Sequence, residues 1–417
     1  MGLLPCPLLS RQPNDQDSVN TSQAHLHSYS STSSLSSVPS LSSSSSSSSA
    51  ATHHRLLSTL KSHSSPVFSL ALAPKHLFSG SSNSEIRSWS RDPSSPDNTI
   101  LIPSSRSAVK SIVLSGDTLF TAHQDHKIRV WKTDNNTKNY HYRCVNTLPT
   151  AGDRLTRCLW AKNYVEVRRH KKCTWVHHVD AVSALALSRD GSLLCSVSWD
   201  RTFKVWRTSD YKCLESVWNA HDDAINAVVL SSDGFVYTGS ADTKIKVWRR
   251  HDGEKKHRLV DTLEKHKSAV NALALSTDGS VLYSGACDRS IIVWEKDSCG
   301  GGGGDGGKHM VVVGGLKGHK KAILCLVAVA DLVCSGSADK TVRIWRRGSS
   351  GREYSCLSVL EGHNGPVKCL AAAVDSCGGG GGGGGDSNSG CGTSYKIYSG
   401  SLGCDIKVWQ MWVPFLE

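Results

Sequence analysis

The chain lacks several features that whole classes of protein require. Its 15 cysteines include no Cys-x-x-Cys pair, so cysteine spacing predicts neither a zinc site nor a disulfide framework, and no metal or other cofactor is expected. No apolar run is long enough to span a membrane, and residues 1–10 lack the basic start of a secretory signal. Acidic residues are in the minority, at 36 against 48 Lys and Arg, for a net charge of +12. We expect a basic protein of a reducing compartment, the cytoplasm or the nucleus.

Residues 1–54 contain almost no aromatic residues and show no hydrophobic period. Serine dominates from Ser28 to Ser49, and such a composition cannot bury enough apolar surface to fold. We therefore predict a disordered tail over 1–54 and a folded domain over 55–417. A plastid or other organelle transit peptide is the alternative, but Arg11 is the only Lys or Arg before Arg55, which argues against it.

Beyond the tail, one pattern recurs in seven copies, each closing on a tryptophan. In the clearest copy, His221 precedes an apolar run, and an alternating run follows Asp242 and ends at Trp248. A Ser or Thr stands ten residues before the tryptophan in every copy. Period-two alternation predicts strands, four in each unit, and makes the repeat itself the folding unit. The closing residues are Trp89, Trp131, Trp206, Trp248, Trp294, Trp345 and Trp409.

These repeats resemble those of the WD40 family from about Arg55 to Trp409. The resemblance implies an all-β fold, a seven-bladed WD40 β-propeller, in which a tetrad of His, Ser or Thr, Asp and Trp stabilises each blade. Three copies depart from the pattern: Asn83 replaces the Asp of blade one, Ser105 the His of blade two, and Gly403 the Asp of blade seven. Weaker networks are expected there. The complete tetrads of blades three to six are His178, Ser196, Asp200 and Trp206; His221, Thr238, Asp242 and Trp248; His266, Ser284, Asp288 and Trp294; and His319, Ser335, Asp339 and Trp345.

Both ends of the repeat region contribute to one expected blade. Residues 55–60 have the pattern of an outer strand with no blade before them, and the last copy lacks an outer strand, so pairing the two would close the ring. Long inserts are expected at 132–162, 298–309 and 375–393, the first of them ahead of an outer strand of blade two near Val165. All three would lie on one face.

The opposite face carries the connections between second and third strands and those between blades, and we call it the short-loop face. Short, rigid loops favour a preorganised binding surface, so we predict a partner site there. Basic residues recur beside the structural Asp, an aromatic anchor, Trp199, stands next to Arg201, and two acids add a negative sector. Local packing of Trp199 over its neighbour blade is the alternative. The predicted site comprises Trp199, Arg201, His126, Lys244, Arg289, Lys340, Asp180 and Asp223. The expected partner is a protein with an acidic or phosphorylated segment.

No enzymatic function is expected. Gly302 to Lys308 has the spacing of a phosphate-binding loop, but His309 stands where a magnesium-binding Ser or Thr is needed. Residues 145–149, 162–170 and 195–201 resemble the plant WD-repeat proteins of the JINGUBANG type. That resemblance implies a regulatory scaffold that mediates protein–protein interactions, for example in pollen germination.

Two other function classes remain open. A substrate receptor of a cullin-type ubiquitin ligase would need a Trp-[Asp/Glu]-x-[Arg/Lys] ending, and the nearest candidate, 294–297, fails at its last residue, Asp297. An RNA- or phosphoinositide-binding propeller would depend on the net charge alone, and its binding would fall steeply with salt. The basic run 168–172 is compatible with nuclear import or nucleic-acid binding, and also with charges that only keep an outer strand soluble.

Overall fold

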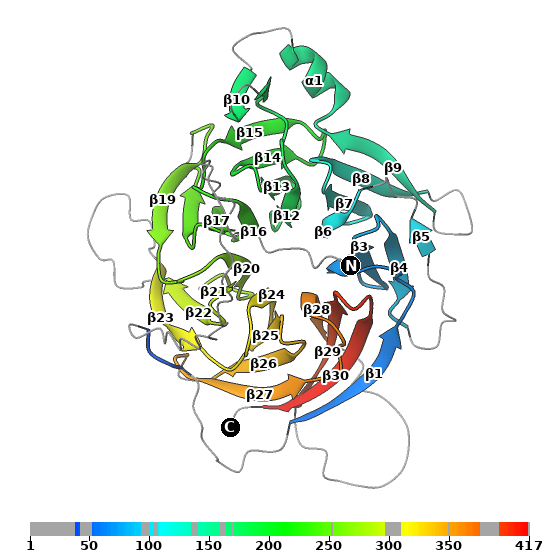
Figure 1. Cartoon of the computed structure of the whole chain (residues 1–417), viewed down its shortest axis with the longest axis vertical. Coiled ribbons are helices and arrows are strands. Elements are labelled where there is room, and N and C mark those ends of the chain that lie inside the picture. The colour runs from blue at the N-terminus through cyan, green and yellow to red at the C-terminus, as the bar shows by residue number, and fades with distance from the viewer. Residues whose placement is uncertain are drawn as a thin grey trace, which may run out of the picture.

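Seven four-stranded antiparallel sheets form a ring around a central axis (Figure 1). The structure is a computed structural model that describes residues 38–41, 52–92, 100–102, 107–134, 141–158, 164–168, 171–251, 253–296, 310–348, 351–375 and 392–415. The predicted seven-bladed β-propeller is confirmed. None of the helices in these ranges is long and apolar enough to cross a membrane.

Within a blade the chain runs from the innermost strand to the outermost, so sheet order follows chain order. Blades one to three are β2 (Val67–Leu72), β3 (His76–Ser81), β4 (Ile86–Ser90) and β5 (Ile100–Ile102); β6 (Val109–Ser115), β7 (Thr118–His123), β8 (Ile128–Asp134) and β9 (His141–Leu148); and β12 (Val182–Leu187), β13 (Leu193–Ser198), β14 (Phe203–Arg207) and β15 (Cys213–Val217). Blades four to six are β16 (Ile225–Leu230), β17 (Phe235–Ser240), β18 (Ile245–Arg249) and β19 (Arg258–Leu263); β20 (Val270–Leu275), β21 (Val281–Ala286), β22 (Ile291–Lys296) and β23 (Met310–Leu316); and β24 (Ile323–Val329), β25 (Leu332–Ser337), β26 (Val342–Arg347) and β27 (Tyr354–Leu360).

Blade seven takes its strands from two distant parts of the chain. Its three inner strands are β28 (Val367–Val374), β29 (Gly392–Ser401) and β30 (Ile406–Pro414), and its outer strand is β1 (His53–Leu60). The antiparallel register runs from His53↔Trp412 to Leu60↔Ile406, and the two strands lie side by side in Figure 1. The outer strand therefore begins two residues before the 55–60 predicted from the sequence.

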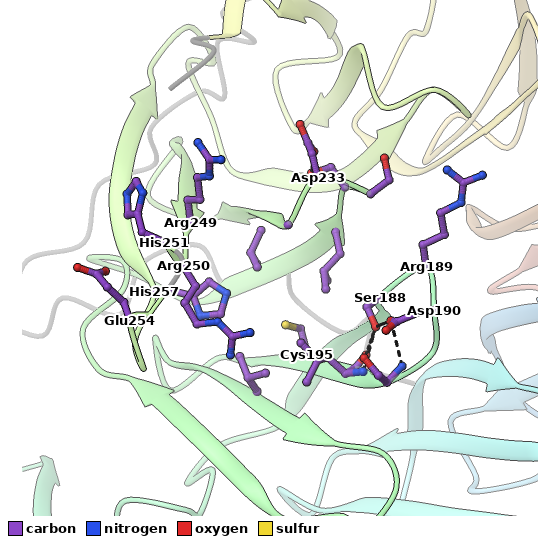
Figure 2. A pocket seen from close by; sticks show the side chains of 18 of the residues that line it. Ser188, Arg189, Asp190, Cys195, Asp233, Arg249, Arg250, His251, Glu254 and His257 are labelled. Atoms are coloured by element: carbon purple, nitrogen blue, oxygen red, sulfur yellow. Dashed lines mark hydrogen bonds between the residues drawn. The ribbon is translucent and has the colours of Figure 1, made fainter. Parts of the chain in front are cut away.

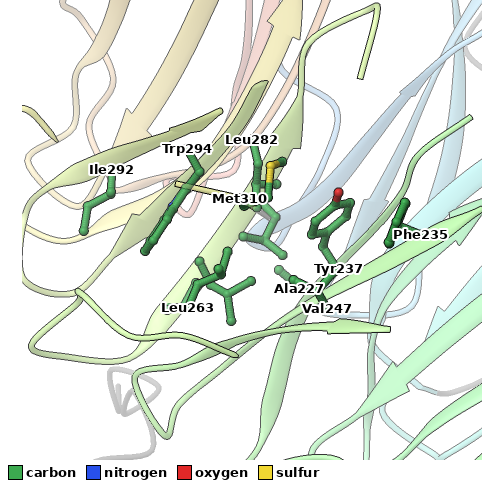
Figure 3. Close-up of a cluster of buried hydrophobic side chains, with 12 residues drawn as sticks. Ala227, Phe235, Tyr237, Val247, Leu263, Leu282, Ile292, Trp294 and Met310 are labelled. Carbon is green, nitrogen blue, oxygen red and sulfur yellow. The ribbon is translucent and has the colours of Figure 1, made fainter. Parts of the chain in front are cut away.

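The hydrophobic core lies between neighbouring blades. Figure 3 shows one such layer, where Tyr237, Val247 and Leu263 of blade four meet Leu282 and Trp294 of blade five. The glycine near the end of a second strand allows equally close packing in the next layer, because a Cβ on Gly285 of blade five would stand 2.5 Å from Ile323 of blade six. The period-two pattern thus places one face of each sheet against each neighbour.

The expected outer strand of blade two near Val165 is wrong. The outer strand is β9, which pairs with β8 from Ile128↔Leu148 to Asp134↔His141. Residues 164–168 form β10, which pairs only with β11 (Lys171–Thr174) in a separate two-stranded sheet. The prediction failed because the short alternating run at 164–168 was indistinguishable from the one at 141–148, which lies closer to β8 in the chain.

The first predicted insert, 132–162, accordingly divides into two parts. Residues 135–140, between β8 and β9, lie outside the described residues, as do 159–163, 297–309 and 376–391. The second part follows β9 and includes the helix α1 (Ala151–Cys158), so it starts on the short-loop face rather than the opposite one. Asp153 of α1 accepts a hydrogen bond from the backbone N–H of Cys213 at 3.2 Å, which holds the helix against the outer edge of blade three (Figure 1).

Most of the predicted disordered tail, residues 1–37 and 42–51, lies outside the described residues. Within it, Val38–Leu41 lies against β23, where Ser40 forms a parallel β-bridge with Gly315.

Candidate functional site

Blade four shows how the structural tetrad works. Trp248 Nε1–H donates to Thr238 Oγ1 at 2.9 Å, so the Thr238 hydroxyl is free to donate to His221 Nε2 at 2.8 Å. His221 Nδ1–H in turn donates to Asp242 Oδ2 at 2.8 Å. Asp242 also accepts the backbone N–H groups of Asp222 and Lys244, each at 3.0 Å. This chain of hydrogen bonds connects the second strand, the third strand and the segment between blades. Each polar group in it has a hydrogen-bond partner.

The tetrads of blades three, five and six have the same geometry. Their His–Asp distances are 3.1 Å for His178 and Asp200, 2.9 Å for His266 and Asp288, and 2.9 Å for His319 and Asp339. Burial opposes ionisation of Asp288, but the hydrogen bond and charge of His266, together with hydrogen bonds from Ser290 and the Lys267 N–H, outweigh it and lower the pKa of Asp288 to about 2. The carboxylates are therefore fixed acceptors at neutral pH, and the network holds the blade together rather than activating a nucleophile.

Blades one and seven complete their tetrads with a carboxylate that sequence reasoning missed. His363 donates to Asp405 at 3.0 Å, and His63 is 3.2 Å from Glu85. Both acids stand four residues before the closing tryptophan, whereas the family pattern has the Asp six residues before it. The expected weakening at Asn83 and Gly403 is therefore compensated. An acid at this alternative position was the signal in the sequence.

Blade two replaces the missing His by one on its own second strand. His123 Nε2 lies 2.7 Å from Thr121 Oγ1, and His123 Nδ1 lies 3.2 Å from the carbonyl oxygen of Ser107. Trp131 still donates to Thr121, at 2.8 Å. Ser105, which stands at the position of the family His, lies outside the described residues. Among the residues that the structure describes, no carboxylate is hydrogen-bonded to this imidazole, yet the bonds to the threonine and the tryptophan are kept.

This substitution makes blade two sensitive to acid. Burial, assisted by the charge of Arg129, lowers the pKa of His123 from 6.5 to about 4. Between these two values the unfolded chain binds a proton that the folded chain does not. The free energy of unfolding should therefore decrease as the pH falls from 6.5 to 4, by up to about 1.4 kcal/mol per pH unit for this histidine. Urea unfolding of wild type and His123→Gln at pH 7, 6 and 5 checks this, and equal pH slopes for the two proteins would contradict it.

The short-loop face is built from seven tight turns between second and third strands. In each turn a backbone N–H bonds to the residue before the innermost strand, as Trp199 N–H does to the Ala181 oxygen at 3.1 Å. His126, Arg201, Arg289 and Lys340 occupy the same left-handed position, with φ between 67° and 73°. Four of the five predicted basic residues are thus equivalent by backbone geometry. His126, Arg289 and Lys340 are exposed, and Arg201 is half-buried.

The other predicted residues of this face are already engaged within the chain. In blade four the left-handed position belongs to Thr243, and Lys244 pairs with Glu264 at 2.9 Å, so its charge is neutralised. Asp180 and Asp223 each accept the backbone N–H of the following residue, at 2.8 and 2.7 Å. These two acids therefore shape their turns.

Trp199 takes part in a cluster that joins three blades at the inner edge of this face. The Lys110 ammonium lies 5.2 Å from the Trp199 ring centroid and 4.5 Å from that of Phe68. Burial, with repulsion from Lys368, lowers the pKa of Lys110 to about 8. Among the described residues no carboxylate forms an ion pair with Lys110 or Lys368. The sequence did not reveal these two lysines, because they come from the inner strands of blades two and seven.

A cleft of about 1230 Å³ lies on the opposite face, between blades three and four. It is lined by the first turns of both blades and, from the connection between the third and fourth strands of blade four, by Arg249, Arg250, His251, Gly253, Glu254, His257 and Arg258 (Figure 2). Some of its polar side chains are paired within the chain: Arg258 with Glu254 at 2.7 Å, and His257 with Glu215 at 2.6 Å. Arg189 and Arg250 are exposed at its rim. Sequence reasoning missed this cleft, since three separate turns have to meet to form it.

In the part of the chain that the structure describes, no group of three His, Cys, Asp or Glu residues could hold a metal ion. The tetrads bury their imidazoles, and the short-loop face offers cations and an aromatic ring. This arrangement can bind an anionic group of a partner.

The family model for the WD domain, G-beta repeat, matches residues 54–90, 170–207, 212–249, 257–295, 310–346 and 354–410. It omits blade two, where the His has moved to the second strand. The chain is 29% identical over 147 residues to Protein HIR1 of Mycosarcoma maydis, covering 31% of this chain and 14% of that protein. It is 26% identical over 243 residues to an uncharacterized WD repeat-containing protein of Schizosaccharomyces pombe, covering 55% and 61%. Less than two thirds of either relative is therefore matched.

Among solved structures, the WD40 β-propeller domain of Doa1 superposes with a TM-score of 0.60 at 20% sequence identity. The match covers 85% of this chain and 96% of that domain. At this identity the likeness concerns the fold alone.

Proposed function

We propose that this chain, which belongs to the WD40 repeat family, is a non-enzymatic scaffold that holds an acidic or phosphorylated segment of a protein partner on its short-loop face. The family and the propeller fold are consistent with protein-interaction scaffolding. The observation that carries the finer proposal is the cluster around Lys110. A half-buried ammonium lies beside two aromatic rings and is repelled by the like charge of Lys368.

An anionic ligand group would relieve two costs at this cluster. It would offset the repulsion between Lys110 and Lys368. It would also compensate, with an opposite charge, for the cost of burying the charged form of Lys110. Arg201, two residues from Trp199, adds a planar donor fork for a carboxylate or phosphate, and the Trp199 ring gives apolar contact area. The regulatory setting in plant development, as in pollen, is part of this proposal through the resemblance to JINGUBANG-type proteins.

A charge-reversal experiment tests the choice of face. The combined change Trp199→Ala and Arg201→Glu should weaken binding to an array of acidic and phosphorylated peptides at least about tenfold, the equivalent of about 1.4 kcal/mol. Circular dichroism and melting temperature should stay near those of wild type, because neither side chain belongs to a tetrad. Fluorescence polarisation on the peptides selected by wild type measures the loss.

The matched control reverses two exposed cations on the opposite face, Arg189→Glu and Arg250→Glu. It should leave peptide binding unchanged. Loss of binding in this control, with retention in the Trp199 and Arg201 variant, would place the site in the cleft of Figure 2 and contradict the proposal. Equal binding of RNA and acidic peptides, abolished by salt, would favour a polyanion-binding protein.

A further inference from the structure

A four-residue segment of the Ser-rich tail is bound at the side of the propeller, far from the short-loop cluster. Val38–Leu41 lies beside β23, the outer strand of blade five, and is visible as the dark blue stretch next to β23 in Figure 1. Gly315 N–H donates to the Pro39 oxygen at 2.8 Å, and Leu41 N–H donates to the Gly315 oxygen at 3.1 Å. These two bonds add a short parallel strand to the free edge of the sheet.

The segment also reaches the next blade. Tyr354 N–H, at the start of β27, donates to the Leu41 oxygen at 3.2 Å. Leu41 packs against the buried layer between blades five and six, which includes Trp345 and Tyr354, and Val38 is only 5% exposed. Pro39 and Ser40 face solvent. The segment is thus held through its backbone and two aliphatic side chains.

The receiving strand is shaped for this contact. A Cβ on Gly314 would stand 2.8 Å from the Pro39 oxygen and would overlap the Leu41 side chain. All three of the heavy atoms nearest to that Cβ belong to the bound segment, so the tightest contacts at this glycine are with Val38–Leu41. Glycine inside a strand is otherwise unfavourable, and it often marks the close approach of another backbone.

The other six outer strands have a side chain at the equivalent position. That position faces the residue just before the closing tryptophan, as Gly314 faces Val293. The equivalents are Ser58, Ile100, Asn146, Glu215, Asp261 and Ser358. Only blade five has glycine there, and only blade five, among the described residues, has a segment added to its edge.

We propose that the edge of β23 together with the start of β27, which we call the blade-five groove, is a peptide-docking site. The chain's own Val38–Leu41 occupies it in cis, and an extended segment of a protein partner with the same chemistry, aliphatic-Pro-small-aliphatic, occupies it in trans. Backbone bonds supply the attachment, and the pockets for Val38 and Leu41 supply the selectivity.

The cis segment and a partner segment compete for the same groove, and the covalent tether of the cis segment determines the balance between them. Ten residues separate Leu41 from Thr52, which is bonded to the Leu357 oxygen of β27 at 3.2 Å. A short tether gives the cis segment a high effective concentration, so a partner segment must either be abundant or be attached through a second site. The tail thereby determines the partner concentration above which a partner segment occupies the groove.

A peptide-binding experiment on the full chain tests the proposal. The probe is a fluorescein-labelled synthetic peptide of residues 35–44, measured by fluorescence polarisation. Val38→Ser with Leu41→Ser frees the groove, and this variant should bind the probe at least tenfold more tightly than wild type does. Adding Gly314→Asp should remove that gain, because the new side chain fills the space of Leu41. A probe with Asp in place of both aliphatic residues should not bind.

Asn146→Asp is the matched control, since it places the same residue at the equivalent position of blade two and should leave probe binding unchanged. Circular dichroism and melting temperature of all variants verify the fold. Probe binding no tighter than wild type in the Val38 and Leu41 variant, or unaltered by Gly314→Asp, would overturn the proposal. If Gly314→Asp unfolds the chain, Gly314→Ala serves instead, with the same expected direction.

Discussion

Deletion of residues 1–62 is expected to destabilise the propeller more than any single substitution, by at least about 4 kcal/mol, because it removes a whole outer strand. β1 makes seven backbone pairs with β30 and covers one side of blade seven. Without it, the edge of β30 presents unpaired backbone groups beside the buried Trp409 and Met411. We expect a melting temperature lower by more than 10 °C, a rough figure from the usual scaling, together with aggregation in size-exclusion chromatography.

The control is deletion of residues 1–37, which leaves both β1 and the docked Val38–Leu41 in place. Its melting temperature should equal that of wild type. If the two deletion variants have the same melting temperature, β1 contributes nothing to ring closure. Deletion of residues 1–50 removes the docked Val38–Leu41 but keeps β1. A melting temperature between those of the other two variants would measure the contribution of the blade-five contact.

Asp242→Ala should lower the free energy of unfolding by about 3 kcal/mol, since the buried imidazole of His221 loses its acceptor and two turn N–H groups lose theirs. Three donors lose their bond: His221 Nδ1–H and the backbone N–H groups of Asp222 and Lys244. Burial opposes ionisation of Asp242, but the hydrogen bond and charge of His221, together with the two backbone N–H bonds, keep the pKa of this carboxyl below its ordinary value. The stabilisation is therefore complete above pH 3.8 and is lost as the pH falls below it.

Asp222→Ala is the matched substitution, because Asp222 is exposed and contacts the tetrad only through its backbone N–H. It should change the free energy of unfolding by less than about 0.5 kcal/mol. Urea unfolding at pH 7 compares the two variants. A similar loss in both would show that the tetrad carboxylate has no special role in the stability of blade four.

The number of blades and the tetrads of blades three to six follow from the sequence because fixed spacings report a fixed strand geometry. The substitutes in blades one and seven were missed although the same geometry allows them. The usual position and the alternative one flank a left-handed residue, Ser84 or Cys404, in the tight turn between the second and third strands. From this turn an acid at Glu85 or Asp405 also reaches the imidazole of its blade. A fixed spacing from the closing tryptophan does not identify these acids, because the network requires only that the carboxylate reach the imidazole.

Contacts between distant segments were beyond sequence reasoning. Lys110 and Lys368 belong to the inner strands of blades two and seven, so Lys368 can repel Lys110 only because the ring closes, and nothing in their local runs marks them. Val38–Leu41 is hidden in a serine-rich stretch, and its partner Gly314 precedes a second glycine that resembles the nearby polyglycine run. The outer strand of blade two was misplaced for a related reason: two short alternating runs competed, and only pairing with β8 distinguishes them.

The antiparallel pairing of β1 with β30 also determines how the ring responds to force. His53 and Trp412 form the first pair, so the start of β1 and the finish of β30 are at the same end of the ladder. Tension between these two points acts across the strands and loads the pairs one after another, as in a zipper, instead of shearing all of them together. The joint that closes the ring is consequently also the place where a pull on the protein begins to open it.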